Sequence, residues 1–143
     1  MWCCRRPAGL SAQVSRQIQA KLREIETVFP RTVVSCIVTQ TGELIAQQVK
    51  PDQERVDDLV LPIAQLKRAA EQFGSTLNQS SCPVVHLRGN RVMFSCYELG
   101  DHLLAFYTDM SGVDLMTYDT ADADSRMGFI IADLRLLFQN LSI

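Results

Sequence analysis

The stretch between residues 82 and 108 constrains the fold more than any other part of the sequence. Three apolar segments follow one another there, Cys82 to Arg88, Arg91 to Leu99 and His102 to Thr108. The pairs that separate them, Gly89-Asn90 and Gly100-Asp101, have the composition favoured in two-residue β-hairpin loops. The sequence therefore predicts three consecutive antiparallel strands.

Loop length sets the register of such a sheet, and two-residue loops place Val85 opposite Phe94 and Cys96 opposite Ala105. One face then carries Val85, Leu87, Val92, Phe94, Cys96, Leu103, Ala105 and Tyr107, and the other carries Val84, His86, Met93, Ser95, Tyr97, Leu104 and Phe106. Both faces are mainly apolar, whereas an antiparallel sheet with one solvated face alternates between apolar and polar residues. We therefore expect other elements to cover both faces.

Three segments have the apolar spacing of amphipathic helices: Ser11 to Phe29, Val56 to Leu77 and Ser125 to Leu141. Pro62 interrupts the second segment, which predicts either a kink or a helix that begins near Pro62. Gly74 is the expected stop signal of that helix, with an extension by one turn to Leu77 as the alternative. Asp124 or Ser125 is the expected N-cap of the last helix.

The segment between the first two predicted helices has the pattern of a β-hairpin. Thr32 to Thr39 is rich in β-branched residues, and Leu44 to Gln48 follows a polar turn that contains Gly42. The chain of 143 residues is the size of one domain. We predict a flexible basic segment at residues 1–10 and one α+β domain at residues 11–143, with an acidic loop at 109–124 and a C-terminal helix at 125–141.

Charge and cysteine content exclude several classes of protein. The net charge of −2 argues against a broadly basic nucleic-acid binder, although residues 1–31 are basic and residues 97–143 are acidic. Residues 1–10 contain no apolar stretch of signal-peptide length, and the sequence has no run long enough to span a bilayer. The five cysteines form no CxxC pair, so neither a disulfide framework nor a zinc knuckle is indicated.

The sequence offers little for catalysis. His86 and His102 have no nucleophile and acid at a recognisable spacing, and we expect a surface or interface ring and an exposed turn residue respectively. No glycine-rich phosphate loop occurs, and the aspartates at 119, 122 and 124 lack the glycine and glutamate of a calcium loop. We therefore predict no catalytic residue, no metal and no cofactor. Cys82 is the best candidate for a reactive thiol, because Cys36 and Cys96 fall in central strands.

The first six residues suggest a lipid-modified terminus. Cys3 and Cys4 stand between Trp2 and two arginines, Arg5 and Arg6, a composition that suits S-palmitoylation and attraction to anionic lipids. An unmodified, frayed terminus is the alternative. We expect a cytoplasmic protein, which lipidation would bring to an endomembrane surface.

The order of elements resembles the roadblock family, the dynein light chains and small-GTPase regulators of the longin-like group. The resemblance covers Leu22 to Asp109, and the terminal helix resembles that of the longer members. It is carried by Val33-Val34-Ser35-Cys36-Ile37-Val38, by Gly42-Glu43-Leu44-Ile45-Ala46, by the helix Leu59 to Phe73, and by the residues from Val92 to Phe106. The residues after Asp109 and the Cys-Arg start depart from the short dynein light chains.

The resemblance implies a five-stranded antiparallel sheet in the order 2-1-5-4-3, with the second helix on one face and the first and third on the other. It also implies dimers, in which the second helices pack together and the third strands pair edge to edge. Pro83 suits the start of such an edge strand. The candidate dimer contacts are Gln65, Arg68, Ala69, Gln72, Val84, His86 and Arg88.

In functional terms the resemblance implies a non-enzymatic dimeric scaffold or adaptor. Its partners would be a second roadblock-like chain, identical or different, and a small Ras-like GTPase or its regulatory complex. Two alternatives remain open at this point. One is a dynein-associated light chain, and the other is a small-molecule sensor with a cavity around His86, Ser95 and Tyr97.

Overall fold

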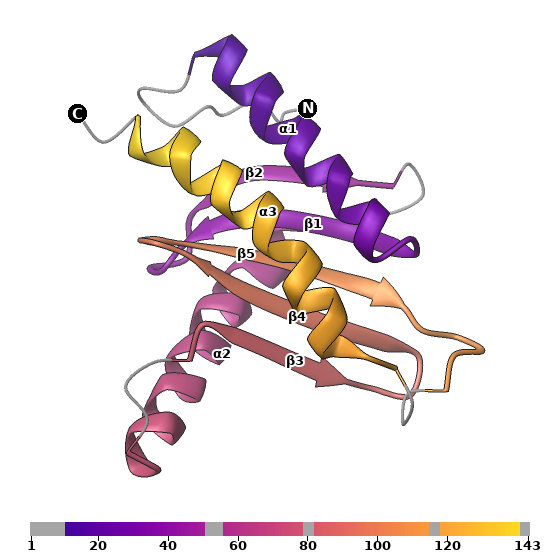
Figure 1. Ribbon diagram of the computed structural model, residues 1–143. Helices are drawn as coiled ribbons and strands as arrows, with labels where there is room; N and C mark the ends of the chain where they lie inside the picture. Colours follow the sequence, from indigo (N-terminus) through magenta and orange to yellow (C-terminus); the bar gives the residue numbers. More distant parts are fainter. Residues whose placement is uncertain (1–10, 51–55, 79–81, 115–117, 141–143) are drawn as a thin grey trace.

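The computed structural model describes residues 11–50, 56–78, 82–114 and 118–140. Its elements are α1 (Ala12–Val28), β1 (Thr32–Thr39), β2 (Leu44–Val49), α2 (Asp57–Thr76), β3 (Val84–Arg88), β4 (Val92–Leu99), β5 (His102–Asp109) and α3 (Thr120–Gln139). The five strands form one antiparallel sheet in the order β2-β1-β5-β4-β3 (Figure 1). The fold class and the strand order agree with the prediction.

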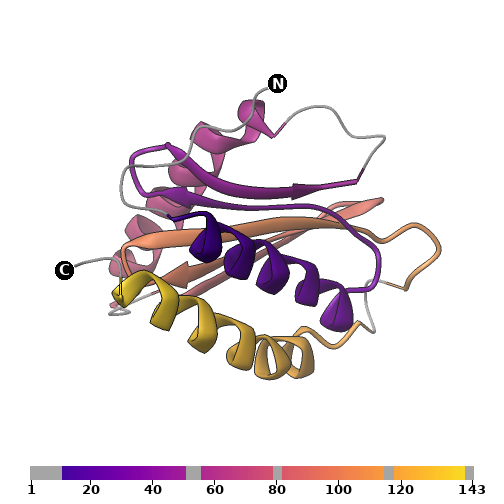
Figure 2. The same cartoon turned by 90° about the horizontal axis from the view of Figure 1, so that it is seen from above.

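The sheet lies between two helical layers, with α1 and α3 on one face and α2 on the other (Figure 2). The predicted division of side chains between the faces is confirmed. Met93, Tyr97 and Phe106 pack with α1 and α3, whereas Cys96 and Leu103 pack with α2. Each layer therefore has its own hydrophobic core.

The register of the β4–β5 hairpin was predicted correctly, and that of the β3–β4 hairpin was not. The β4–β5 register is as predicted, with Leu99 opposite His102, and Gly100 takes the positive φ of 67° that a tight hairpin loop needs. The β3–β4 register is not, because Arg88 pairs with Met93 and Val85 pairs with Cys96.

The cause of the error lies in the loop between β3 and β4. Neither Gly89 nor Asn90 has a positive φ, and the N–H of Gly89 donates to the carbonyl of Val92 at 2.8 Å. The loop is therefore wider than two residues, and the pairing moves by two positions. An even shift keeps every side chain on its predicted face.

The end of α2 follows the alternative with the extension to Leu77, whereas the start of α3 differs from the prediction. The helix α2 runs through Pro62 and past Gly74, and its end is followed by Asn78 in the left-handed region at φ 59°. Asparagine tolerates this conformation, so it supplies the stop expected of Gly74. The helix α3 begins at Thr120, five residues before Ser125, because the side chain of Asp119 accepts a hydrogen bond from the N–H of Asp122.

The helices α1 and α3 lie side by side and run in opposite directions (Figure 1). Lys21 Nζ lies 2.6 Å from Asp133 Oδ2, and Arg126 Nη2 donates to the Thr27 carbonyl at 2.7 Å. Among the described residues, no helix has the length and apolar content needed to cross a bilayer.

Candidate functional site: the surface between α2 and β3

The helix α2 covers only part of its face of the sheet. Val60, Ile63 and Ala64 are buried against the strands, but the C-terminal end of α2 projects past the edge strand β3 (Figure 1). The strand β3 is the last strand of the sheet and pairs with β4 along one side. This corner of the molecule therefore combines an open strand edge with a projecting helix.

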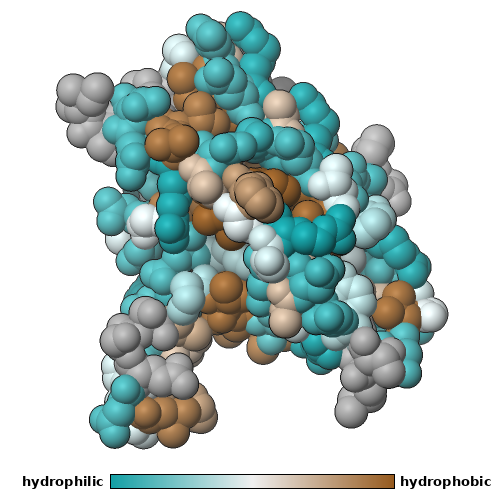
Figure 3. All heavy atoms as spheres, in the orientation of Figure 1, coloured by the Kyte–Doolittle hydropathy of each residue, from teal (hydrophilic) through white to brown (hydrophobic). Residues whose placement is uncertain are grey.

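Large apolar side chains are exposed at the end of α2 and on β3. Phe73 and Leu77, at the end of α2, are 68% and 57% exposed, and Leu87, on the α2 side of β3, is 49% exposed. Val85 and Phe94 beside it are half-buried on the same sheet face. Hydrophobic atoms gather over the projecting end of α2 at the lower left of Figure 3. We call these five residues the α2–β3 surface.

The α2–β3 surface was missed in the sequence. Helical spacing assigned Phe73 and Leu77 to the core, and the face assignment placed Leu87 beneath a covering element. The length of the helix could have indicated this exposure. A helix of 20 residues is roughly 30 Å long, whereas a sheet of five strands is only about 20 Å wide across the strands. A helix that crosses the strands at a steep angle projects beyond such a sheet, so the expectation that other elements cover both faces holds only in part, because Phe73, Leu77 and Leu87 are exposed.

The candidate dimer contacts fall into two groups that the structure separates. Gln65, Arg68, Ala69 and Gln72 are all exposed along α2. Val84, His86 and Arg88 lie on the opposite side of the sheet, where Val84 packs with the α1–α3 core and the two polar residues contact the start of α3. Pairing of two β3 strands uses backbone groups only, so the α2 residues and the β3 residues can lie on either side of the same paired strands. Their role in a dimer remains a prediction.

His86 belongs to a hydrogen-bonded cluster of four side chains. Its Nδ1 lies 2.8 Å from Ser95 Oγ, and its Nε2 lies 2.8 Å from Asp124 Oδ1, which also accepts the Tyr97 hydroxyl at 2.5 Å. Burial, followed by the hydrogen bond to Asp124, raises the pKa of Tyr97, so the phenol keeps its proton and donates it. Asp124 was expected to cap α3, but it joins α3 to the sheet instead.

The same residues are the ones that the sensor alternative named. His86, Ser95 and Tyr97 do come together, as that alternative required, but they come together as packed side chains. Ser95 is fully buried, so its hydroxyl is not accessible to a substrate even though serine, histidine and aspartate lie in line. The arrangement is suited to holding α3 in place.

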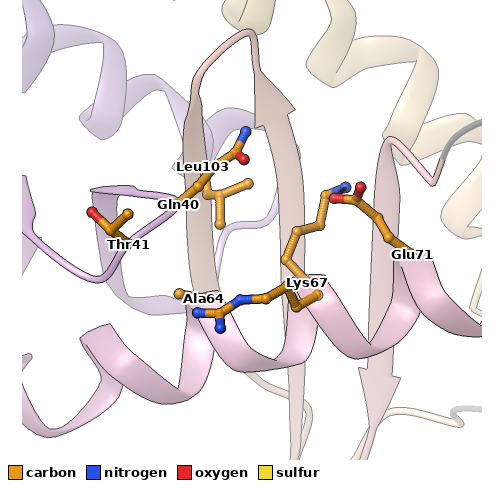
Figure 4. Close-up of a pocket in the computed structure, with 7 residues that line it drawn as sticks. Gln40, Thr41, Ala64, Lys67, Glu71 and Leu103 are labelled. Atoms are coloured by element: carbon orange, nitrogen blue, oxygen red, sulfur yellow. Dashed lines mark hydrogen bonds and ion pairs between the residues drawn. The ribbon is translucent and has the colours of Figure 1, made fainter.

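A shallow pocket of about 420 Å³ lies on α2 beside the β1–β2 turn (Figure 4). It is lined by Gln40, Thr41, Ala64, Lys67, Arg68, Glu71 and Leu103. Lys67 is 3% exposed, and its Nζ lies 2.8 Å from Glu71 Oε1 and 3.6 Å from Glu98 Oε1. Burial by itself lowers the pKa of Lys67, but the hydrogen bond to Glu71 and the two carboxylate charges outweigh burial and raise it. The buried positive charge of Lys67 is therefore balanced by the carboxylates of Glu71 and Glu98.

The remaining candidate residues have structural surroundings. Burial raises the pKa of both Cys36 and Cys96 to about 12, as befits core thiols, and Cys82 is half-buried. His102 was expected to be exposed, but its ring stacks on Phe138 with a centroid distance of 4.5 Å, because α3 reaches over the β4–β5 turn. In the part of the chain that the structure describes, no three His, Cys, Asp or Glu side chains come close enough to hold a metal ion. Cys3, Cys4 and residues 1–10 lie outside the described residues.

Comparison with known proteins gives matches in structure alone. No protein-family model and no curated protein sequence matches this sequence. A solved structure of MglB in a tetrameric arrangement is similar over 96% of this chain and 99% of its own, with 15% identity and a TM-score of 0.77. The gliding protein MglB from Thermus thermophilus is similar over 96% and 99%, with 13% identity and a TM-score of 0.75.

A Roadblock/LC7 domain from Streptomyces avermitilis extends the same likeness. It is similar over 85% of this chain and 97% of its own, with 13% identity and a TM-score of 0.68. At identities this low, structural similarity establishes the fold but not what the protein binds or how it assembles. The strand order, the placement of the three helices and these structural matches agree, and the chain therefore has the fold of the roadblock proteins.

Proposed function

We propose that this protein is a non-enzymatic dimeric scaffold that binds a small Ras-like GTPase or its regulatory complex. The second chain of the dimer is either a copy of this one or another roadblock-like chain. The observation that carries the proposal is the α2–β3 surface, where exposed apolar side chains stand beside an unpaired strand edge.

Physical reasoning favours a partner at this corner. An open edge strand presents free backbone N–H and C=O groups, and next to exposed apolar residues it is an aggregation hazard. Antiparallel pairing of β3 with the β3 of a second roadblock-like chain would satisfy those groups and continue the sheet. The same contact would remove Leu87 from water, and packing of the α2 helices would cover Phe73 and Leu77. Burial of apolar surface is the main driving force of such association.

The residues predicted from the resemblance fit around this surface. In the proposed dimer the α2 helices pack through Gln65, Arg68, Ala69 and Gln72, and the small side chain of Ala69 permits close approach. Val84, His86 and Arg88 border the paired strands on the other side of the sheet. These contacts are part of the proposal.

The GTPase partner is proposed from the resemblance in sequence to the regulators of small GTPases within the roadblock family. The MglB structures add a fold of the same type, and one of them is described as tetrameric. In this model the scaffold performs no chemistry and acts by holding the switch segments of the GTPase in one state. Lipidation of Cys3 and Cys4 would place the scaffold at an endomembrane surface.

The oligomeric state tests the dimer. We expect native mass spectrometry of the purified protein, and of the complex isolated from its own cells, to show two roadblock-like chains. The variant Leu87→Lys places a charge in the α2–β3 surface and should give monomers. The matched control is Leu61→Lys, because Leu61 is similarly exposed, at 52%, but lies beside Gly42 of the β1–β2 turn. A wild-type protein that is monomeric when purified and is also found without a second roadblock-like chain in the complex from its own cells contradicts the proposal, as does equal dissociation by both variants.

The GTPase requires a separate test. The endogenous protein should copurify with a small GTPase, and the purified pair should bind with affinities that differ between the GDP and GTP forms. Leu87→Lys should weaken this binding if the dimer is the binding unit, whereas Leu61→Lys should not. A dimer that copurifies with no GTPase would leave a scaffold of a different kind and contradict the GTPase assignment.

A further inference from the structure

The outer face of α3 carries an apolar stripe that no described element covers. Phe129 is 80% exposed and Leu136 is 58% exposed, and the exposed Ala132 lies between them. Residues spaced by three and four positions share one side of a helix. This side is opposite the one that buries Met127 and Leu134 against the sheet. Figure 3 faces this layer and shows hydrophobic atoms over α3 among hydrophilic ones.

The neighbouring helix α1 carries a basic stripe on its outer side. Arg16 and Arg23 are exposed and seven positions apart, so they lie on the same side of α1. Within the described parts of the chain, neither guanidinium has a hydrogen-bond or ion-pair partner. By contrast, Lys21 is paired with Glu24 and Asp133.

The two stripes lie level with each other. The contacts from Lys21 to Asp133 and from Thr27 to Arg126 fix the antiparallel alignment of the two helices. This alignment puts Arg23 beside the turn that holds Phe129 and Ala132, and it puts Arg16 beside the turn that holds Leu136. The layer thus presents two parallel rows, one apolar and one cationic.

We propose that this face binds an amphipathic helix of a partner protein, with acidic residues along one flank of its apolar side. The apolar side chains of that helix would pack on Phe129, Ala132 and Leu136, where the small Ala132 allows a close approach. Its carboxylates would pair with Arg16 and Arg23 at successive heptad positions. We name this face the α1–α3 surface, defined by these five residues.

Other occupants fit less well. A second copy would bring the same two arginines to the contact, and like charges brought together at an interface oppose association. An anionic membrane would attract the arginines, but as an extended surface it would also meet Asp119 and Asp122, which are exposed at the start of α3 beyond the two rows. The α1–α3 surface is on the opposite side of the sheet from the α2–β3 surface, so it stays open in the proposed dimer and does not depend on it.

Two matched peptides test this proposal on the full-length protein. Each is a stabilised helix of about five turns with leucines at heptad spacing, and one carries glutamates along one flank where the other carries lysines. We expect the acidic peptide to bind at least about tenfold more tightly than the lysine peptide in calorimetric titration. Amide chemical-shift changes should concentrate on the two rows of the α1–α3 surface.

Variants of the protein make the test specific. Arg16→Glu combined with Arg23→Glu should reverse the preference, so that the lysine peptide binds more tightly, and a merely structural defect could not produce such a reversal. Phe129→Ser combined with Leu136→Ser should weaken binding of the acidic peptide by about tenfold or more. Leu61→Ser removes a similarly exposed leucine from the α2 side and should leave binding unchanged.

Three results would overturn the proposal. The first is equal affinity for both peptides, and the second is binding that survives the loss of Phe129 and Leu136. The third is failure of both peptides while vesicles of phosphatidylcholine and phosphatidylserine bind through Arg16 and Arg23, which would assign the face to a membrane. Thermal unfolding of each variant confirms that a loss of binding does not come from misfolding.

Discussion

His86 on the edge strand and Asp124 on α3 are 38 residues apart in the sequence, and a hydrogen bond of 2.8 Å joins their side chains. The same carboxylate accepts the hydroxyl of Tyr97 from β4. Because Asp124 lies near the start of α3, these contacts fix where α3 meets the sheet. They therefore help to set the position of the α1–α3 surface.

Asp124→Ala should lower the free energy of unfolding by about 2 kcal/mol, because it leaves two partly buried donors without an acceptor. Chemical denaturation at neutral pH measures this loss. Asp122→Ala is the matched control, since it removes a carboxylate from the same helix end but leaves His86 and Tyr97 bonded. Equal losses in the two variants would show that general helix-end electrostatics, and not the joint to the sheet, explains the effect.

His102 makes stability sensitive to acid. Burial lowers its pKa below the ordinary value of 6.5, an effect that the charge of Asp101 only partly offsets. The unfolded chain therefore takes up the proton first as the pH falls, so protonation of His102 favours unfolding. His102→Phe keeps an aromatic ring against Phe138 and removes the titration. The wild type should lose stability relative to this variant as the pH falls below 6.5, and a constant difference in urea midpoints across that range would contradict the prediction.

The three described cysteines should differ sharply in reactivity. The thiolate is the reactive form, and burial raises the pKa of Cys36 and Cys96 to about 12. Cys82 is half-buried at the start of the edge strand. In a Cys3→Ser, Cys4→Ser background, iodoacetamide should label Cys82 well before the other two, as followed by mass spectrometry of the peptides. Labelling of Cys36 at the same rate in folded protein would contradict the packing of the α2 layer.

The two cysteines at the start of the sequence remain a proposed lipid anchor. If Cys3 and Cys4 are acylated, the wild type should be retained in the membrane fraction of cells, and the Cys3→Ser, Cys4→Ser variant should be released. Hydroxylamine treatment, which cleaves thioesters, should release the wild type in the same way. Identical distribution of wild type and variant would exclude the anchor.

Local patterns in the sequence predicted most of the fold correctly. The periods of apolar residues gave five strands and three helices, and the division of the sheet into faces held even where the β3–β4 register moved. The register itself failed because a Gly-Asn pair is compatible with more than one loop, and the hydrogen bond from Gly89 to Val92 decided between them. The boundary at Ser125 failed because Asp119 caps the helix as well as Asp124 could.

The candidate sites were harder to predict, because exposure depends on where each element ends relative to its neighbours. The sequence by itself determined that Phe73 is on an apolar side of a helix, but only the tertiary structure places that part of the helix beyond the edge of the sheet. It likewise determined that the stretch around Phe129 is helical, whereas the direction of α1 relative to α3 decided that an apolar row stands level with two unpaired arginines. Periodicity is a local property of the chain and can be read from the sequence. The meeting of His86 with Asp124, and of one surface row with another, depends on packing between distant segments, which the tertiary structure alone decides.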